Sequence, residues 1–394
     1  MSLRVDPSLL KDLDKFGAFD IKACFNCGNC SAVCTLSEEN TAFPRRMIRY
    51  AQLGLKDHLI SSKELWLCYY CGACSDTCPR QAEPGEFMAS ARRLAIAGFE
   101  PTGLARLLYV SPWSVTIGLV LLAVILTMFM LAFSPGVPAG LVSTAKMLDF
   151  IPYELIHWTG IGVLAFLGLA SVITVINMIW SLANAPEPWE KEQSDPRPGV
   201  FPLKAAVKSA KNTLSEILFQ SRYQDCNEDE YADKAKPWFL KHWFIHWSIM
   251  IGFFGLGAAT GLDYMFKDPD LHVSLWYPMR LLGTVSGGLL MYGSTAAIVG
   301  RLRQPDKYYT RSHYSDWVFL GLLWVVGLTG FILEIVIYLP VNGVWVYVVF
   351  LAHVVLAMEL LVLFVFTKFA HAVYRPLALW FYDFNRIRKG IDKV

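Results

Sequence analysis

Six long apolar stretches constrain this chain more than any other feature of its sequence. They cover residues 112 to 133, 153 to 182, 242 to 263, 279 to 300, 315 to 338 and 345 to 372. Each is long enough to cross a bilayer as a helix, which takes about 20 mostly apolar residues. Because 55% of the 394 residues are hydrophobic and 17% are charged, a soluble domain of this length is excluded. The sequence predicts an all-α protein with a six-helix transmembrane bundle.

The part of the chain before the first apolar stretch has a different composition. Residues 1 to 105 are mixed and charged, and the apolar character rises at Pro112. We therefore expect a soluble head at 1–105 and a membrane domain at 106–394, whose spans are interrupted by a loop at 183–241. The net charge of +2 excludes a strongly basic nucleic-acid binder.

Eight of the nine cysteines repeat one spacing, C-x2-C-x2-C-x3-C, within the head. This is the pattern of ferredoxins that hold two [4Fe-4S] clusters, in which the last cysteine of each run ligates the other cluster. The first cluster is therefore expected on Cys24, Cys27, Cys30 and Cys78. The second is expected on Cys68, Cys71, Cys74 and Cys34.

Structural zinc is the alternative use of such cysteines. Zinc also takes four thiolates, but usually as two separated C-x2-C pairs, so it explains two triplets poorly. Gly28 and Gly72, each directly after the second cysteine of a run, let the backbone approach a cluster closely. Residues 42 to 60 show apolar positions at helical spacing, so the clusters are expected to be joined by helices.

The sequence also lacks several redox motifs. It has no G-x-G-x-x-G after a strand that would bind a flavin or nicotinamide, no C-x-x-C-H for a c-type haem, and no Cys-Cys-Gly run. The glycines between Gly252 and Gly261 lie in an apolar stretch and are expected to pack helices together. We therefore expect the chain to pass electrons rather than to perform hydride or disulfide chemistry.

The connectors between the stretches predict the orientation. Segments 183–241, 301–314 and 373–394 carry 9, 4 and 5 Lys or Arg, whereas 134–152, 264–279 and 339–344 carry 1, 1 and none. By the positive-inside rule the first set is cytoplasmic, with both termini, and the spans lie in the inner membrane. The first 20 residues contain no basic segment followed by an apolar run. No cleaved secretion signal is therefore expected, and the cysteines should lie in a reducing compartment.

The 183–241 loop contains a basic amphipathic helix, expected over residues 203 to 220. Its apolar face is suited to lying on membrane lipid, and docking to a partner subunit is the second use considered.

Histidines within apolar stretches are candidate haem ligands, because coordinating residues in spans are rare and usually functional. His353 and His371 lie 18 residues apart in the sixth stretch. On one straight helix that separation is five turns, so the two rings would face one direction about 27 Å apart. One helix would thus offer a ligand to a haem b in each leaflet.

Each haem also needs an opposing ligand. On the cytoplasmic side the candidates are His242 and His246, of which His246 lies deeper in the third stretch and is preferred. On the outer side His157 is the candidate partner of His353, with His272 as the second choice.

These motifs give the chain a resemblance to two known families. The head resembles the small iron-sulfur subunit of heterodisulfide reductases, and the spans resemble the cytochrome b family of nitrate reductase gamma subunits. Their combination is similar to the membrane subunit of quinone-interacting membrane-bound oxidoreductase (Qmo) complexes. The gamma subunits carry two haem ligands 18 residues apart on the last helix, as His353 and His371 are. Their opposing ligands lie ten residues apart on one helix, whereas Gly252 and Leu256 occupy those positions here.

The resemblance implies a respiratory electron-transfer subunit with haem b and menaquinone. Its implied partners are flavin- and iron-sulfur-containing cytoplasmic subunits, and adenylylsulfate reductase. The alternative is a related complex that serves disulfide reduction with another quinone or methanophenazine. A transporter would need polar residues along a path, and only Glu334 and Glu359 are carboxylates deep in the last two stretches.

A quinone pocket needs hydrogen-bond donors and a route for protons. Arg280 and Glu334 lie near the outer ends of their stretches and are the first candidates. The alternative structural roles are a lipid or propionate partner for Arg280 and a helix–helix hydrogen bond for Glu334. A site in the cytoplasmic leaflet would instead lie near Arg301, Arg303 and His313.

Overall fold

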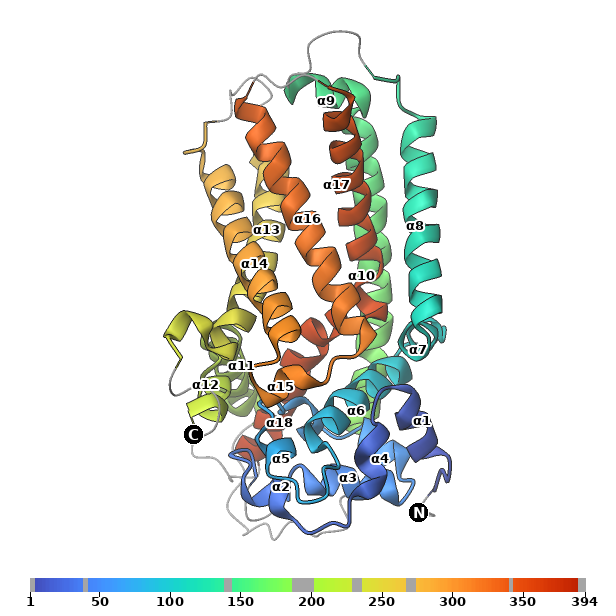
Figure 1. The fold of residues 1–394 in the computed structure, drawn as a ribbon, viewed down its shortest axis with the longest axis vertical. Helices are drawn as coiled ribbons and strands as arrows, with labels where there is room; N and C mark the ends of the chain where they lie inside the picture. The colour runs from blue at the N-terminus through green and yellow to red at the C-terminus, as the bar shows by residue number, and fades with distance from the viewer. Residues whose placement is uncertain are drawn as a thin grey trace.

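The structure, a computed structural model, is helical throughout its described parts. It describes residues 4–37, 42–137, 144–185, 202–228, 236–266, 274–339 and 343–388. The regular elements in these residues are α-helices and 3-10 turns. The predicted all-α class is therefore confirmed. Six long helices stand side by side at one end, and the head gathers at the other (Figure 1).

Short helices build the head around one apolar core. Leu9, Phe16, Met47, Trp66 and Phe87 are fully buried in it. Two helices join the cysteine runs, as predicted. The head elements are α1 (Leu9–Lys15), η1 (Phe19–Ala23), α2 (Asn29–Ala32), α3 (Arg45–Gln52), α4 (Lys56–Ile60), η2 (Glu64–Trp66), α5 (Ala73–Asp76) and α6 (Pro84–Phe99).

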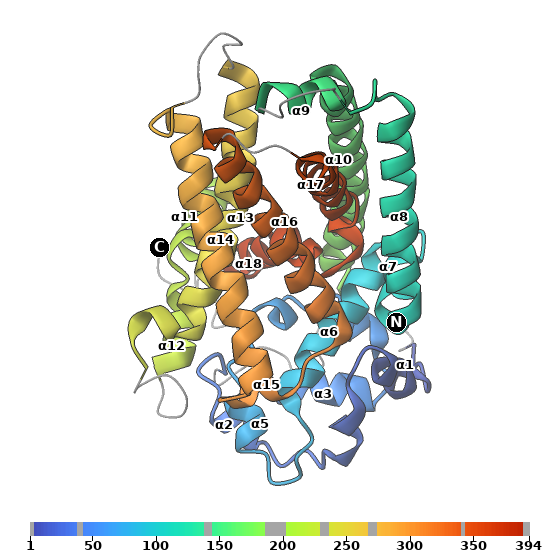
Figure 2. The same ribbon diagram turned by 45° about the horizontal axis from the view of Figure 1, so that its top comes forward.

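The six long helices have the length and apolar composition of membrane spans. Their neighbours in space follow the order α13, α14, α16, α17 and then α10 with α8 (Figures 1 and 2). The first five agree closely with the predicted stretches. The spans are α8 (Pro112–Ala132), α10 (Tyr153–Ala183), α13 (His242–Phe266), α14 (Pro278–Arg303), α16 (Tyr314–Tyr338) and α17 (Val344–Val362).

Glycines let α13 and α14 approach closely, as predicted for part of the glycine-rich stretch. A Cβ at Gly252 would lie 2.6 Å from the backbone nitrogen of Leu290, and one at Gly293 would lie 2.8 Å from the carbonyl oxygen of Ile245. Small residues at a helix interface allow such contact in a membrane. Gly257 and Gly261 have open space around them, so they do not contribute to this packing.

The sixth span is shorter than predicted, and this corrects the sequence analysis. α17 ends at Val362, two 3-10 turns follow, η4 (Phe364–Phe366) and η5 (Lys368–Ala370), and α18 (His371–Arg388) then begins as a separate helix. The break has a tertiary cause, because the Lys368 ammonium donates to Asp316 at the base of α16 at 2.6 Å. His353 and His371 therefore do not lie five turns apart on one helix.

α18 joins the head to the membrane spans. Its Tyr374 is buried, and the Tyr374 ring lies 5.8 Å from Trp66 and 5.5 Å from Phe99. Met178 and Leu182 at the end of α10 belong to the same apolar core. The head is thus packed onto the spans through a shared core, which fixes the cysteine runs relative to the membrane helices.

Shorter elements complete the described chain. They are α7 (Leu104–Val110), α9 (Thr144–Phe150), α11 (Pro202–Phe219), α12 (Ser221–Glu228), η3 (Trp238–Leu240) and α15 (Lys307–Thr310). The predicted amphipathic helix is α11, and it packs on α18, where the Ser209 hydroxyl donates to the carbonyl of Trp380 at 2.6 Å. Its Leu203, Leu214 and Leu218 side chains remain exposed.

Candidate iron-sulfur and haem sites

The two cysteine runs adopt the same backbone path. In each, a glycine follows the second cysteine with a left-handed backbone, at φ +93° for Gly28 and +90° for Gly72. A one-turn helix, α2 or α5, then carries the third cysteine. Glycine takes this conformation without the strain that a Cβ would bring. The repeat in sequence is therefore also a repeat in structure.

Backbone amides point at the first sulfur of each run in the same way. The N–H of Asn26 donates to Cys24 Sγ at 3.4 Å, and the N–H of Tyr70 donates to Cys68 Sγ at 3.3 Å. Both donors have positive φ, which turns the amide toward the sulfur. Hydrogen bonds to sulfur are one of the features by which a protein sets the potential of a cluster.

The thiols fall into two crossed groups. Burial raises the pKa of the Cys30 thiol to about 11, and the neighbouring thiols that add to the rise are those of Cys24, Cys27 and Cys78. Burial also raises the pKa of Cys74 well above its usual range, and its neighbouring thiols are those of Cys68, Cys71, Cys34 and Cys30. The structure thus brings Cys78 to the first triplet and Cys34 to the second.

The chemistry of these thiols fits a cluster. A buried thiol with a raised pKa keeps its proton unless a metal replaces it, because coordination deprotonates a thiol outright. Within the described ranges, no three His, Cys, Asp or Glu side chains are placed to hold one metal ion. A [4Fe-4S] cluster needs a wider set, since its four thiolates bind four different irons.

The loop that carries Cys68 faces the membrane domain. The Arg92 guanidinium donates to the Cys68 carbonyl at 2.7 Å, and Arg375 on α18 donates to the carbonyls of Cys68 at 3.3 Å and Leu67 at 3.2 Å. A Cβ at Gly72 would lie 3.2 Å from the backbone nitrogen of Tyr308, on α15. Elements of the membrane domain therefore hold this loop on two sides.

Aromatic rings connect the Cys68 loop with α13. Tyr69 and Tyr223 stack with ring centroids 4.5 Å apart, and the Arg375 guanidinium lies 3.7 Å from the Tyr69 ring. Tyr223 then meets His246 edge-on at 5.6 Å. The sequence analysis missed these residues, because nothing in the sequence signals that α12 folds back onto the head.

His246 and His371 lie ring to ring. Their centroids are 6.1 Å apart and their planes form an angle of 62°. Two imidazoles that share one metal at about 2 Å per bond place their ring centroids about 6 Å apart. The geometry therefore fits the pair of axial ligands that a haem b takes.

Hydrogen bonds orient both imidazoles. His371 Nδ1 lies 3.1 Å from the Lys368 carbonyl, and His246 Nδ1 lies 3.0 Å from the Gln220 side-chain nitrogen and 3.2 Å from its oxygen. In metal sites a partner at one ring nitrogen fixes the ring and leaves the other nitrogen for the metal. Nε2 is therefore the candidate ligand atom of both side chains.

His242 takes a different role from His246. Its Nδ1 lies 2.6 Å from the Tyr223 hydroxyl, and its ring stacks on Tyr308 at 4.1 Å with an angle of 8°. Stacking and hydrogen bonding together favour a structural role for His242 at the junction. This arrangement supports the choice of His246 as the cytoplasmic ligand.

His353 lies in the middle of α17 and faces α16. Its Nδ1 is 3.0 Å from the Thr329 hydroxyl, and a Cβ at Gly330 would come within 3.1 Å of the imidazole. His157 lies one turn inside α10 and stacks on Tyr153 at 5.7 Å. His353 is two and a half turns inside its own helix, so the two enter their spans to different depths. His272 lies outside the described residues.

Arg280 and Glu334 both bond to neighbouring helices. Arg280 on α14 donates to the Tyr338 hydroxyl at 3.1 Å, and the Thr284 hydroxyl donates to Glu334 on α16 at 2.7 Å. The seam between α14 and α16 thus brings the two candidates to the same side of the bundle. It also gives each a partner of the structural kind considered above.

A buried ion-pair network that the sequence analysis missed runs behind the Cys68 loop. Arg93 lies 2.9 Å from Glu86 and 3.6 Å from Asp316, and Asp316 also pairs with Lys368 at 2.6 Å. The network ends three residues before His371. The only signal in the sequence was a carboxylate and a lysine at the ends of two apolar stretches, where charge is costly unless paired.

Comparisons with known proteins address the head. Residues 20–82 match the 4Fe-4S dicluster domain family. The head is a two-cluster iron-sulfur domain. The match covers both cysteine runs and stops before the first membrane span.

The head is also similar to small subunits of heterodisulfide reductases. One such subunit, from the H2:CoB-CoM heterodisulfide, ferredoxin reductase of Methanothermobacter marburgensis, is 33% identical over 96 residues, which are 24% of this chain and 52% of that relative. The iron-sulfur subunit of the CoB–CoM heterodisulfide reductase of Methanopyrus kandleri is 37% identical over 75 residues, 19% of this chain and 39% of that relative. The chain thus spans about half the length of these relatives or less. No solved structure matches it.

Proposed function

We propose that this protein is the membrane subunit of a respiratory oxidoreductase, which passes electrons between menaquinone and iron-sulfur and flavin subunits in the cytoplasm. The observation that carries the proposal is the placement of the Cys68 loop against the His246 and His371 pair, through Tyr69, Tyr223 and Arg375. When bound, a haem b and two [4Fe-4S] clusters would supply one-electron carriers there.

The chain's own residues hold these carriers close and shield them from water. Tyr69 and Tyr223 fill the space between the Cys68 loop and α13 and are both buried. Arg375, Lys368 and Arg92 act electrostatically on both imidazoles. Cations beside a redox centre stabilise its reduced form, since reduction adds a negative charge.

The other cluster faces away from the membrane and is the proposed contact with partner subunits. Cys27 is exposed, and Phe25 beside it is 61% exposed. An exposed aromatic side chain next to a redox centre is suited to a partner interface. The partners proposed from the resemblance are flavin- and iron-sulfur-containing subunits and, through them, adenylylsulfate reductase.

The outer part of the bundle is proposed to hold a second haem b and the quinone. His353 is the proposed ligand, with His157 as its opposing candidate. Arg280 and Glu334, on the α14–α16 seam, remain candidates for quinone binding. This part of the proposal rests on residue types and helix positions.

The orientation proposed from the Lys and Arg counts puts the head in the cytoplasm and the spans in the inner membrane. The structure supports the arrangement in one respect, because α1 and α18 lie at the same end of the bundle (Figure 1). The exposed leucines of α11, with Lys204, Lys208 and Lys211 on the same helix, are proposed to contact membrane lipid.

A heterodisulfide-reductase-like complex is the second candidate function. The similarity of the head to small subunits of those reductases favours it. Such a complex would use methanophenazine or another quinone at the membrane. The two candidates differ in their electron donor, while the roles of the cysteines and histidines stay the same.

The test is spectroscopy on the purified full chain. A reduced-minus-oxidised optical spectrum with a pyridine haemochrome assay should show haem b, and addition of a water-soluble menaquinol analogue should reduce it. Chemical analysis should find about eight irons and eight sulfides for two clusters. A protein that folds and carries clusters but binds no haem would contradict the proposal, and reduction by a phenazine alone would favour the second candidate.

A further inference from the structure

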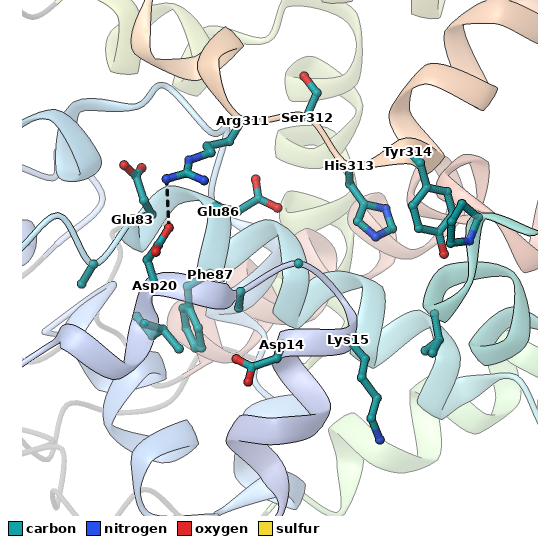
Figure 3. A pocket seen from close by; sticks show the side chains of 16 residues that line it. Asp14, Lys15, Asp20, Glu83, Glu86, Phe87, Arg311, Ser312, His313 and Tyr314 are labelled. Carbon is teal, nitrogen blue, oxygen red and sulfur yellow. Dashed lines mark ion pairs between the residues drawn. The ribbon is translucent and has the colours of Figure 1, made fainter.

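A cavity of about 490 Å³ lies at the junction of the head and the spans (Figure 3). The head contributes α1, η1 and α6 to its walls, and the membrane domain contributes the segment between α15 and α16 and the start of α8. The volume is in the range of pockets that bind small organic ligands.

Polar groups stand at two sides of this junction cavity. The Arg311 guanidinium pairs with Asp20 at 3.0 Å on one side, and His313 lies on the other, as Figure 3 shows. Phe87, Val110 and Pro112 line the walls as well. The cavity thus combines apolar surface with hydrogen-bonding groups at two separated points.

The tautomer of His313 follows from its contacts. The backbone N–H of Ser315 donates to His313 Nδ1 at 3.3 Å as part of the cap of α16. Because a backbone N–H cannot accept, Nδ1 is the acceptor, and the proton of the neutral ring is on Nε2. His313 therefore offers an N–H donor that the cap does not use. Arg311 keeps N–H groups beyond those that face Asp20, since a guanidinium has five.

One tyrosine connects the cavity wall with the Cys68 loop. Glu86 lines the cavity, and its carboxylate accepts from the Tyr70 hydroxyl at 2.8 Å. The backbone N–H of the same tyrosine donates to Cys68 Sγ at 3.3 Å. The cavity is therefore about the length of one tyrosine from a candidate cluster ligand.

The cavity also borders the lipid-facing surface. Val110, Pro112 and Tyr314 line it at the points where α7 leads into α8 and where α16 begins. Beside them Leu107 and Trp113 expose large apolar side chains. An apolar molecule in the membrane could reach the cavity along this surface without crossing water.

We propose that the junction cavity binds the head group of a quinone, with His313 and Arg311 donating hydrogen bonds to its two ring oxygens. This inference rests on the proposed function and deepens it, because it places the quinone beside the head rather than at the α14–α16 seam. The ligand class follows from the cavity: a ring-sized space with apolar walls, two donors on separate sides, a border with lipid and a nearby candidate cluster ligand.

The test measures binding of a fluorescent hydroxyquinoline N-oxide, a quinol analogue, to the purified full chain in lipid nanodiscs. His313→Asn removes the Nε2 donor but keeps a side chain that caps helices well. It should weaken binding about tenfold, the effect of losing one hydrogen bond of ordinary strength. Arg311→Gln, at an exposed position, is the second variant and should weaken binding similarly. His58→Asn, in the head against Tyr50, is the matched control and should bind as the unaltered protein does.

Glu334→Gln separates the two quinone positions. Normal binding by this variant together with weak binding by His313→Asn supports the junction cavity. Weak binding by Glu334→Gln, with normal binding by His313→Asn and Arg311→Gln, would assign the site to the α14–α16 seam and overturn the inference while the proposed function stands. No binding of the probe or of a menaquinone analogue by the unaltered protein would overturn both.

Discussion

The imidazole of His371 lies 6.1 Å from that of His246, centroid to centroid, at the point where α18 begins. α18 carries Arg375 four residues later, and Arg375 bonds to the carbonyls of the Cys68 loop. One helix therefore fixes both a candidate haem ligand and the loop of a candidate cluster. The break after α17 makes this possible, because a straight sixth helix would have carried both residues along the span axis.

This pairing predicts the effect of removing either ring. His371→Ala and His246→Ala should each abolish the same haem b, because one iron needs both axial ligands. Optical redox spectra and haem content of the purified full chain measure this. His242→Ala is the matched control on α13 and should retain the haem. Loss of haem in His242→Ala, with retention in His246→Ala, would exchange the roles of the two histidines.

The crossed thiol groups give a second prediction. Cys78→Ser should impair the cluster held by Cys24, Cys27 and Cys30, although it lies in the other run. Low-temperature EPR of the reduced full chain should then show loss or change of one cluster signal and retention of the other. Cys34→Ser should affect the remaining signal.

Cys226→Ser is the control for these cysteine variants, because this cysteine lies outside both runs. It should leave both signals unchanged. If Cys78→Ser altered the same signal as Cys74→Ser, the ligands of each cluster would come from a single run, against the crossed assignment.

Sequence patterns predicted the helical class and the spans well because both follow from local chemistry. An apolar run long enough to cross a bilayer has few alternatives to a helix, since the backbone must satisfy its own hydrogen bonds in lipid. The cysteine spacing likewise determines which thiols can approach one cluster. These features depend on neighbours in sequence, so a single chain reveals them.

The end of the sixth span could not be predicted in this way. The apolar run continues from Val362 to Val373, past the point where α17 ends. Its interruption depends on Lys368 pairing with Asp316, a contact between residues far apart in sequence. The same holds for Tyr223, which the fold of α12 brings to Tyr69. Tertiary contacts therefore decided the details that matter most for the site.

Arg375 gives a third prediction. Arg375→Gln should lower the midpoint potential of the haem at His246 and His371, because it removes a cation that stabilises the reduced state. Arg375→Lys should keep most of the potential, since it retains the charge, although it loses the paired contacts with two carbonyls. An optical redox titration measures both. Arg386→Gln, at the far end of α18 and bonded to Tyr382, should not change the potential.

The last prediction concerns the pH dependence of the junction. Burial, aided by Arg93 and Lys368 and opposed by Asp316, lowers the pKa of His313 to about 3. The ordinary pKa of histidine is about 6.5, so between these values the unfolded chain binds a proton that the folded chain excludes. Stability contributed by neutral His313 is therefore present above about pH 6.5 and declines as the pH falls toward 3. Thermal unfolding of the full chain at pH 7.5 and pH 5.0 should show a larger drop in Tm than His313→Asn shows. Comparing the two proteins cancels the titration of groups that they share, so equal drops would mean that His313 is solvated and charged at pH 5.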